Sequence, residues 1–538
     1  MIHEVPKERD SPPQVPIQDS NPSPPHRIET ASTQIPTPSA SETVNSDFLQ
    51  ALSALSTLLP DEGRINHLLS PLPAAGGNVL LRELAYRTRI FRDLFQSWEN
   101  LHLAPHASGN LQLLNPIIGL SPLDRDDYNR LRVFMNAFAQ KLFPWTMPYF
   151  ADHMGLHASF YSGGRGIVFT AGTDQARYLL TSIPAIRRLG CDLPIEVIYL
   201  GDDDLNDDAR DSLEALPGVV TVDIEEMIDD KGWKLKGWAA KPFAMLYSSF
   251  REVIFMDADA LFLTNPEDLF HDEQYINTGA LFFKDRSMFF ENKKAWLRSI
   301  LPKPISRHVK QNRMWTGESG HMQDSGVVVI DKWKHFVALL LTTRLNGPDR
   351  DGDKGTGKKG VYELVYGDKE TFWLSWELSG DLGYAFHDGG AGIMGSLGTG
   401  EPDEIHDEFA EEDEEDEDED EEEEWQTIAT PTTTSQHKKP VPSAKPRICS
   451  PQLLHLDRDG KPMWFNGWLH TSKTKDAGYQ SFEVYMREPI RRKGEDSPWE
   501  LRKSNVVCLS AEEYFEFSAQ EQGRLGALLE SAKKSSEQ

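Results

Sequence analysis

Apolar residues change their spacing along this chain, and the change divides it into regions. From Asp47 to about Tyr161, leucine and aromatic residues recur at the intervals of an amphipathic helix. From Gly166, short apolar runs alternate with longer helical stretches. This alternation predicts a mostly parallel sheet with helices on both faces. We therefore expect an α/β fold of the Rossmann-like type, preceded by an N-terminal helical region.

Predicted strands and helices alternate through the second region. The strands are 167–170, 194–200, 219–224, 252–256, 279–283 and 326–330. The helices are 175–189, 206–216, 241–250, 332–345 and 368–378. Right-handed crossovers place the loops after parallel strands along one edge of the sheet, and ligands bind at that edge. The turn at 170–174 and the residues after Met256 should both lie there.

Composition adds further boundaries to this picture. The predicted parts are a disordered Pro/Ser-rich N-terminus at 1–46, a helical stem or accessory region at 47–161, a core at 162–388, an acidic disordered insert at 389–446, and a C-terminal part of the same domain at 447–538. Residues 401–424 hold 19 Asp or Glu and no Lys or Arg, so they account for most of the net charge of −29. No basic face is evident, and nucleic-acid binding is not expected.

Cysteines and apolar segments limit the class of protein. The three cysteines contain no metal-type pair, and they allow one disulfide whose partners the spacing does not identify. No apolar stretch is long enough to span a membrane, and the first residues have no signal core. Membrane attachment is therefore expected only if an anchor lies outside this sequence.

Two aspartates, Asp257 and Asp259, follow directly on the apolar run 252–256. Side chains at i and i+2 of a strand point to the same side, and a turn lets them converge. Hard divalent cations prefer oxygen ligands and leave room for phosphate oxygens. The pair thus predicts a metal-bound diphosphate site, although a strand followed by a polar turn would look the same.

A second candidate group lies some two hundred residues further on. His455 follows an apolar pair, and Gly460, Lys461 and Pro462 come shortly after it. An imidazole can complete an oxygen-rich site for a manganese-type cation, and a lysine can neutralise a departing diphosphate. A lone histidine is more often structural, so the hypothesis depends on the two features together.

These motifs give the chain a specific resemblance. It is similar to the GT-A glycosyltransferases, and most similar to the fungal α-1,3-mannosyltransferase family, glycosyltransferase family 71. The matching segments span about 166–470 and are 167–172, 241–246, 253–261, 278–283, 323–332 and 367–370. Each segment alone is a weak signal, whereas their order and spacing together are a stronger one.

The resemblance implies a metal-dependent retaining transferase. The donor would be a nucleotide sugar, GDP-mannose, and the acceptor a mannose-containing glycan or glycoprotein that is extended in α-1,3 linkage. By this resemblance, Asp257, Asp259 and His455 would hold a divalent cation, manganese, and Asp257 and Lys461 would contact the donor diphosphate. The family works in the Golgi lumen or membrane.

The resemblance also gives roles to other residues, each with a plain structural alternative. Further donor contacts would come from Lys241 and from the turn residues Thr170, Ala171, Gly172 and Asp174. Asp324 and Asp368 would be the catalytic carboxylates, acting either as a nucleophile or, as we favour, by binding the hydroxyls of the donor sugar. Trp464 and Trp468 would form an acceptor platform, or they would belong to the core.

Three alternatives remain open from the sequence. A UDP-sugar transferase with glucosyl or galactosyl specificity would show the same motifs. A phosphatase of the haloacid dehalogenase type also places Asp-x-Asp after a strand, but it prefers Thr or Val where this chain has Ala260. An interaction protein that uses the acidic tract would leave the two aspartates, His455 and Lys461 unexplained.

Overall fold

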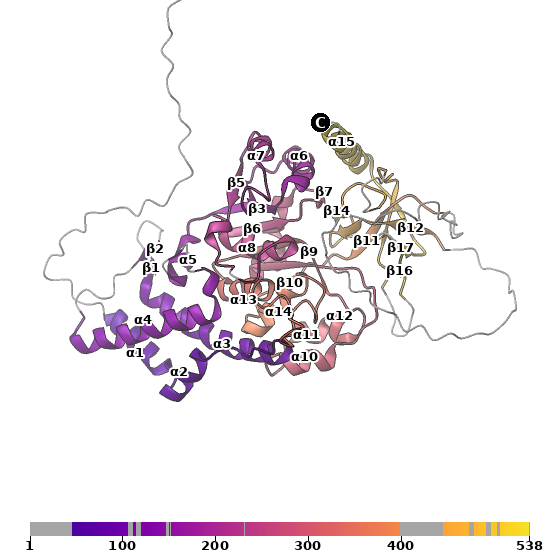
Figure 1. The fold of residues 1–538 in the computed structure, drawn as a ribbon. Helices are drawn as coiled ribbons and strands as arrows, with labels where there is room; N and C mark the ends of the chain where they lie inside the picture. Colours follow the sequence, from indigo (N-terminus) through magenta and orange to yellow (C-terminus); the bar gives the residue numbers. More distant parts are fainter. Residues whose placement is uncertain are drawn as a thin grey trace, which may run out of the picture.

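A seven-stranded sheet forms the centre of the molecule (Figure 1). The computed structural model describes residues 46–105, 111–113, 120–146, 150, 152–230, 232–398, 445–472, 478–490, 497–502 and 506–536. The sheet order is β10-β8-β9-β6-β3-β4-β5. Its strands are β3 (Arg165–Thr170), β4 (Ile195–Tyr199), β5 (Val219–Asp223), β6 (Glu252–Met256), β8 (Ala280–Lys284), β9 (Gln323–Asp331) and β10 (Ala385–Phe386).

The sheet is mostly parallel, as predicted, and β9 is the exception. It runs antiparallel to both of its neighbours, β6 and β8. The apolar pattern of a strand buried on both faces carries no information on its direction. The predicted βαβ rhythm is therefore confirmed, but the sequence did not identify this reversed strand.

Helices cover both faces of the sheet (Figure 1). Alternate side chains of β3 go to opposite sides, since Ile167 and Phe169 pack in one core cluster and Val168 in another. The first cluster includes α6 (Thr173–Arg188), and the second includes α8 (Ala240–Tyr247), α13 (Phe336–Asn346) and α14 (Thr371–Ser379). Shorter helices complete these layers: α7 (Asp207–Glu214), α9 (Glu273–Thr278), α10 (Lys294–Ile300), α11 (Arg307–Gln311) and α12 (Arg313–Thr316).

The predicted N-terminal helical region is confirmed. It consists of α1 (Ser46–Leu58), α2 (Glu62–Leu69), α3 (Gly77–His102), α4 (Pro122–Leu142) and α5 (His153–Ser159), with a short pair β1 (Leu103–Pro105) and β2 (Leu111–Leu113). Ser121 caps α4 by accepting a hydrogen bond from the Asp124 backbone N–H, and Pro122 opens the helix. Phe95 of α3 lies 5.3 Å from Phe336 of α13 between ring centroids, so both regions share one core.

The C-terminal residues add two smaller sheets. A six-stranded sheet has the order β18-β15-β11-β13-β14-β7, and a three-stranded sheet has the order β12-β17-β16. Their strands are β7 (Leu261–Phe262), β11 (Ala391–Gly395), β12 (Arg447–Ser450), β13 (Leu453–Leu456), β14 (Pro462–Asn466), β15 (Val484–Arg487), β16 (Trp499–Leu501), β17 (Val507–Ser510) and β18 (Phe515–Glu516). The strand β7 begins just after Asp259 and pairs with β14. This sheet therefore joins the segment of Asp257 and Asp259 to the segment that holds His455 and Lys461.

The structure corrects the predicted boundary of the acidic insert. The predicted insert 389–446 includes β11, whose residues are all buried between β13 and β15, so that boundary was wrong. The rest of the insert from 399 to 444, like the N-terminus 1–45, lies outside the described residues.

Cys449 of β12 and Cys508 of β17 face each other in register and form the disulfide, whereas Cys191 is a buried thiol. The last helix, α15 (Ala519–Ser536), packs on α6.

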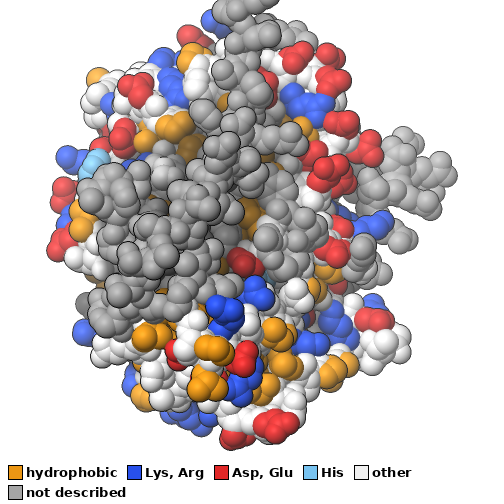
Figure 2. Space-filling model, turned by 90° about the vertical axis from the view of Figure 1, so that its left-hand side faces the viewer, with side chains coloured by type: hydrophobic (Ala, Val, Ile, Leu, Met, Phe, Trp, Pro, Cys, Tyr) orange, Lys and Arg blue, Asp and Glu red, His pale blue; other side chains and the backbone are white. Residues whose placement is uncertain are grey.

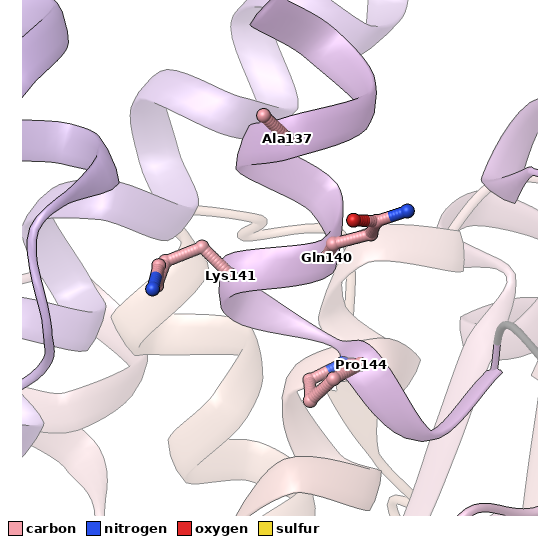
Figure 3. Close-up of a pocket in the computed structure, with 4 residues that line it drawn as sticks. All are labelled: Ala137, Gln140, Lys141 and Pro144. Carbon is pink, nitrogen blue, oxygen red and sulfur yellow. The ribbon is translucent and has the colours of Figure 1, made fainter.

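The described surface of the helical region carries side chains of mixed type. Figure 2 shows hydrophobic, basic and acidic side chains interspersed on the described part of that face. A hollow of about 410 Å³ lies at the end of α4 (Figure 3). Its polar side chains, Gln140 and Lys141, point away from each other. In the described residues, no helix is both long and apolar enough to cross a membrane.

Candidate active site

Three strand ends bring the predicted site residues to one edge of the central sheet. The parallel strands β3 and β6 end at this edge, and the antiparallel strand β9 begins there. Asp257 follows β6, and its backbone N–H donates to the Gly326 carbonyl of β9 at 2.8 Å. From β3 the chain continues to β4 and β5 on one side, while β6 lies on the other. The strand order thus reverses between β3 and β6, which is where open α/β sheets bind ligands.

A lysine, Lys241, lies among the carboxylates at this edge. It belongs to the first turn of α8, and its Nζ is 2.9 Å from the Asp257 carboxylate. The same Nζ lies 3.7 Å from Asp368 Oδ2 and donates to Ser325 Oγ at 3.3 Å. Residues from α8, β6, β9 and the segment before α14 therefore converge on one ammonium group.

The electrostatics of this group show an excess of negative charge. Burial raises the pKa of Asp257 to about 7, Lys241 opposes that rise, and Asp259 and Asp368 add to it. Burial alone would lower the pKa of Lys241, but the carboxylates of Asp257, Asp368 and Asp324 raise it above its ordinary value. One of the Asp368 oxygens, Oδ2, is buried without a hydrogen-bond partner among the described residues. These carboxylates carry more negative charge than Lys241 neutralises, so the cluster can bind a further cation.

Asp324 and His455 form a second buried pair beside the first. His455 Nε2 lies 2.8 Å from Asp324 Oδ2, and both side chains are almost fully buried. Burial alone would raise the pKa of Asp324, but the His455 hydrogen bond and charge lower it well below its ordinary value. Asp324 is therefore ionised and can only accept, so Nε2 carries the proton and donates it.

His455 was predicted as a metal ligand, and in the structure its Nε2 faces Asp324 at 2.8 Å. A histidine that donates one ring N–H to a carboxylate keeps the lone pair of its other ring nitrogen for a cation, so the metal-ligand role stays a prediction. The ring also stacks on Trp464 of the neighbouring strand, with 3.9 Å between centroids and 15° between planes. Within the described ranges, no three His, Cys, Asp or Glu side chains are arranged as a ready metal site.

The Asp pair nevertheless fits a hard cation. Asp257 and Asp259 lie side by side at the strand end, and both remain partly accessible. Burial and the negative charge of Asp259 raise the pKa of Asp257, and a divalent cation would relieve this repulsion between the two carboxylates. The remaining ligands would be phosphate oxygens and water, as is usual for hard cations bound through one or two carboxylates.

The turn predicted to contact the nucleoside packs against the loop that follows β4. The Thr173 backbone N–H donates to the Asp204 carbonyl at 2.7 Å, and the Asn206 N–H donates to Thr173 Oγ1 at 3.0 Å. A Cβ on Gly172 would come within 2.7 Å of Asp204 Oδ1, so only glycine fits there without movement. Asp174 is exposed. The turn follows β3 at the same edge of the sheet as Asp257, and its packing partner Asp204 was not recognised from the sequence.

Lys461 and the two predicted acceptor tryptophans lie in the C-terminal sheet. Lys461 is exposed in the turn between β13 and β14, where its backbone N–H donates to Asp457 Oδ1 at 2.8 Å. Trp464 is fully buried between His455, Phe262 and Phe283. Trp468 is 7% exposed and packs on Tyr178. For both tryptophans the structure favours the core-packing interpretation over an acceptor platform.

Sequence reasoning missed a further charged group next to Asp324. Lys369 Nζ lies 3.0 Å from Asp285 Oδ2 at the end of β8, and Arg286 Nε lies 3.8 Å from Asp285 Oδ1. Burial alone would raise the pKa of Asp285, but Lys369 and Arg286 lower it. Lys369 is the residue after Asp368, so a search for charges beside the candidate carboxylates could have found it.

Glu370 anchors the segment that leads into β9. Its Oε1 accepts from the backbone N–H groups of Met322 at 2.7 Å and Gln323 at 3.3 Å, and its Oε2 accepts from Trp373 Nε1. Burial raises the pKa of Glu370 to about 7. The residue lies too deep to contact a ligand, and it fixes the backbone just before Asp324.

Comparisons with known proteins agree on the type of enzyme. A family model described as "Mannosyltransferase putative" matches residues 164–457. The chain is 29% identical over 259 residues to "Putative alpha-1,3-mannosyltransferase MNN14" of Candida albicans, covering 44% of this chain and 36% of that protein. It is 25% identical over 360 residues to alpha-1,3-mannosyltransferase MNT2 of Saccharomyces cerevisiae, covering 60% and 55%. The chain thus spans only about a third to a half of the length of these relatives.

Solved structures show a more distant likeness. The mannosyltransferase Ktr4p of S. cerevisiae aligns with a TM-score of 0.30 at 11% identity, covering 42% of this chain and 69% of that one. Core-mannan synthase A of Aspergillus fumigatus, in a Mn/GDP form, aligns with a TM-score of 0.28 at 11% identity, covering 42% and 73%.

Proposed function

Because the chain belongs to the mannosyltransferase family whose model matches residues 164–457, we propose that it transfers mannose from GDP-mannose to a mannose-containing glycan, in α-1,3 linkage and with retention of configuration. The observation that carries the proposal is the cluster at the end of β6. There Asp257, Asp259, Asp324 and Asp368 share one edge of the sheet, and Lys241 lies among them.

Asp257 and Asp259 would hold a divalent cation, which supplies positive charge to the donor diphosphate when it is bound. Lys241 holds the Asp257 carboxylate in place at 2.9 Å and adds a second fixed positive charge at the same position. Lys461, at the exposed turn between β13 and β14, is a candidate for a further contact to the leaving diphosphate. The turn 170–174 is the candidate nucleoside contact at the neighbouring strand end.

The two candidate carboxylates differ in what they can offer the donor sugar. Asp324 is held by His455, and its oxygens are partly occupied. Asp368 has a buried oxygen with no hydrogen-bond partner among the described residues, so it can accept from a sugar hydroxyl without losing a bond. We propose that Asp368 binds the donor sugar and that Asp324 keeps His455 oriented beside it. A nucleophilic role for Asp324 would use Oδ1, which accepts from the Gly326 backbone N–H at 3.2 Å.

Turnover of the donor tests this proposal. Purified protein with Mn²⁺, GDP-mannose and an α-linked mannose oligosaccharide should yield GDP and a glycan one mannose longer, and linkage analysis should find a new α-1,3 bond. Asp259→Ala should abolish the reaction, whereas the exposed control Asp126→Ala on α4 should retain it. Equal turnover by Asp259→Ala and the parent would contradict the site. Stabilisation by UDP and not by GDP in thermal unfolding would favour a UDP-sugar donor instead.

A further inference from the structure

Four aromatic side chains form a continuous row on the surface beside the charged cluster. Trp238 lies 6.3 Å from Tyr366 between ring centroids, Tyr366 lies 5.9 Å from His321, and His321 lies 6.0 Å from Phe289. Trp238, Tyr366 and Phe289 are 59%, 57% and 51% exposed. Single exposed aromatic residues are ordinary on protein surfaces, but a contiguous row of large rings indicates a binding surface.

Three of the four rings of this aromatic row lie within three residues of a charged residue of the site. Trp238 precedes Lys241 by three residues, Tyr366 precedes Asp368 by two, and His321 precedes Asp324 by three. Three separate segments therefore each supply one buried charged group and one ring at the surface. This repeated arrangement ties three rings of the aromatic row to the charged residues of the cluster.

The backbone at two positions is adapted to hold these rings in place. Gly367 has a φ of +59°, and a Cβ there would be in ordinary contact with Cε3 of Trp238 at 3.5 Å, so the indole lies next to the backbone just before Asp368. Phe289 has a φ of +54° although it is not glycine, and its ring is half exposed. Bulky residues adopt positive φ at a cost, and such positions concentrate at ligand sites.

We propose that the row Trp238–Tyr366–His321–Phe289 is the acceptor subsite and binds the sugar rings of a mannose-containing oligosaccharide. The inference rests on the proposed transferase function. Aromatic faces pack against the apolar C–H faces of pyranose rings, while the carboxylates behind them accept hydrogen bonds from hydroxyls. Burial lowers the pKa of His321, so its ring is neutral and can contribute as an uncharged face. This subsite replaces the acceptor platform predicted at the buried Trp464 and Trp468.

Direct binding of a mannose trisaccharide tests the subsite without requiring turnover. The full chain is titrated with α-linked mannotriose by calorimetry in the presence of GDP and Mn²⁺. The Kd of Trp238→Ala and of Tyr366→Ala should each be at least roughly tenfold higher than that of the parent, as expected for large aromatic residues at the centre of a binding surface. Tyr366→Phe keeps the ring and should bind as the parent does. Tyr514→Ala, at a tyrosine that is also largely exposed but lies outside the row, is the matched control and should bind normally.

The result separates this inference from the proposed function. Equal mannotriose binding by Trp238→Ala, Tyr366→Ala and the parent would overturn the subsite, even if GDP-mannose turnover is observed. Weakened binding by both variants, with an unchanged melting temperature, would support the subsite even if GDP-mannose is not the donor. Equal weakening by Tyr514→Ala would also overturn it, because the effect would then not belong to the row.

Discussion

Two buried lysines lie at opposite ends of helix α8, and their surroundings differ. Lys241 is in the first turn, with Asp257 at 2.9 Å and Asp368 at 3.7 Å. Lys332, which follows β9, donates to the carbonyl of Leu246 at 3.2 Å and to the carbonyl of Ser248 at 2.7 Å, where the helix ends. Both side chains are almost fully buried, so burial alone does not tell which one serves a ligand.

The neighbours of each lysine distinguish the two roles. Carboxylates around Lys241 outweigh the effect of burial and raise its pKa. Lys332 has mainly carbonyl oxygens and the face of Phe160 at 4.0 Å, with Glu196 as its charged neighbour, and burial lowers its pKa to about 7. A cation at a helix C-terminus also complements the helix dipole, whereas one at the N-terminus opposes it. The position of Lys241 is thus explained by the carboxylates of the site, and that of Lys332 by the stability of α8.

The largest expected effect is the loss of activity on replacing Lys241. Lys241→Met removes the only ammonium within 4 Å of Asp257 among the described residues, and kcat should fall roughly a thousandfold, which corresponds to about 4 kcal/mol. Steady-state assays of GDP release would measure it, and thermal unfolding would confirm the fold. Activity within a few-fold of the parent would show that Lys241 only balances charge.

Replacement of Lys332 should instead affect stability. Lys332→Met leaves the carbonyls of Leu246 and Ser248 without a donor, which should cost about 2–3 kcal/mol of unfolding free energy. The kcat of the folded fraction should stay within a few-fold of the parent. Denaturant unfolding and active-site-normalised rates measure the two quantities, and an unchanged stability with a large loss of kcat would reverse the roles assigned here.

The pH dependence of stability gives a smaller but more specific signal. Lys332 has a pKa of about 7 in the folded protein and 10.5 as its ordinary value. Between these values the unfolded chain binds more protons, so stability rises with pH. The difference in unfolding free energy between the parent and Lys332→Met should therefore increase by about 1 kcal/mol from pH 7 to pH 8. A constant difference would mean that Lys332 stays charged when folded.

The comparison also shows which parts of the molecule were predictable. The period of the apolar residues predicts β6 at its observed bounds, and it also predicts the helical region. Both are predictable because buried positions are occupied by apolar residues at the period of the strand or helix. Asp257 and Asp259 were recognisable because they follow such a strand. The direction of β9 was not, because pairing direction depends on which distant strands lie beside it.

Side-chain partners across long sequence separations were the least predictable part of the site. His455 and Asp324 are 131 residues apart, and nothing local to either indicates that the two are paired. The same holds for the burial of Trp464, whose faces are filled by residues from other strands. A motif identifies which chemistry is available, whereas tertiary packing decides which partner each group has.

The smallest expected effect concerns Ser325, which contacts Lys241 but is not charged. Its Oγ accepts from Lys241 Nζ at 3.3 Å, a long bond compared with the contact to Asp257. Ser325→Ala should lower kcat by only about three- to fivefold, because a single neutral hydrogen bond contributes about 1 kcal/mol. If Ser325 acts only through Lys241, the double variant Lys241→Met/Ser325→Ala should be no slower than Lys241→Met in the same assay. An additional loss in the double variant would mean that Ser325 also contacts the donor directly.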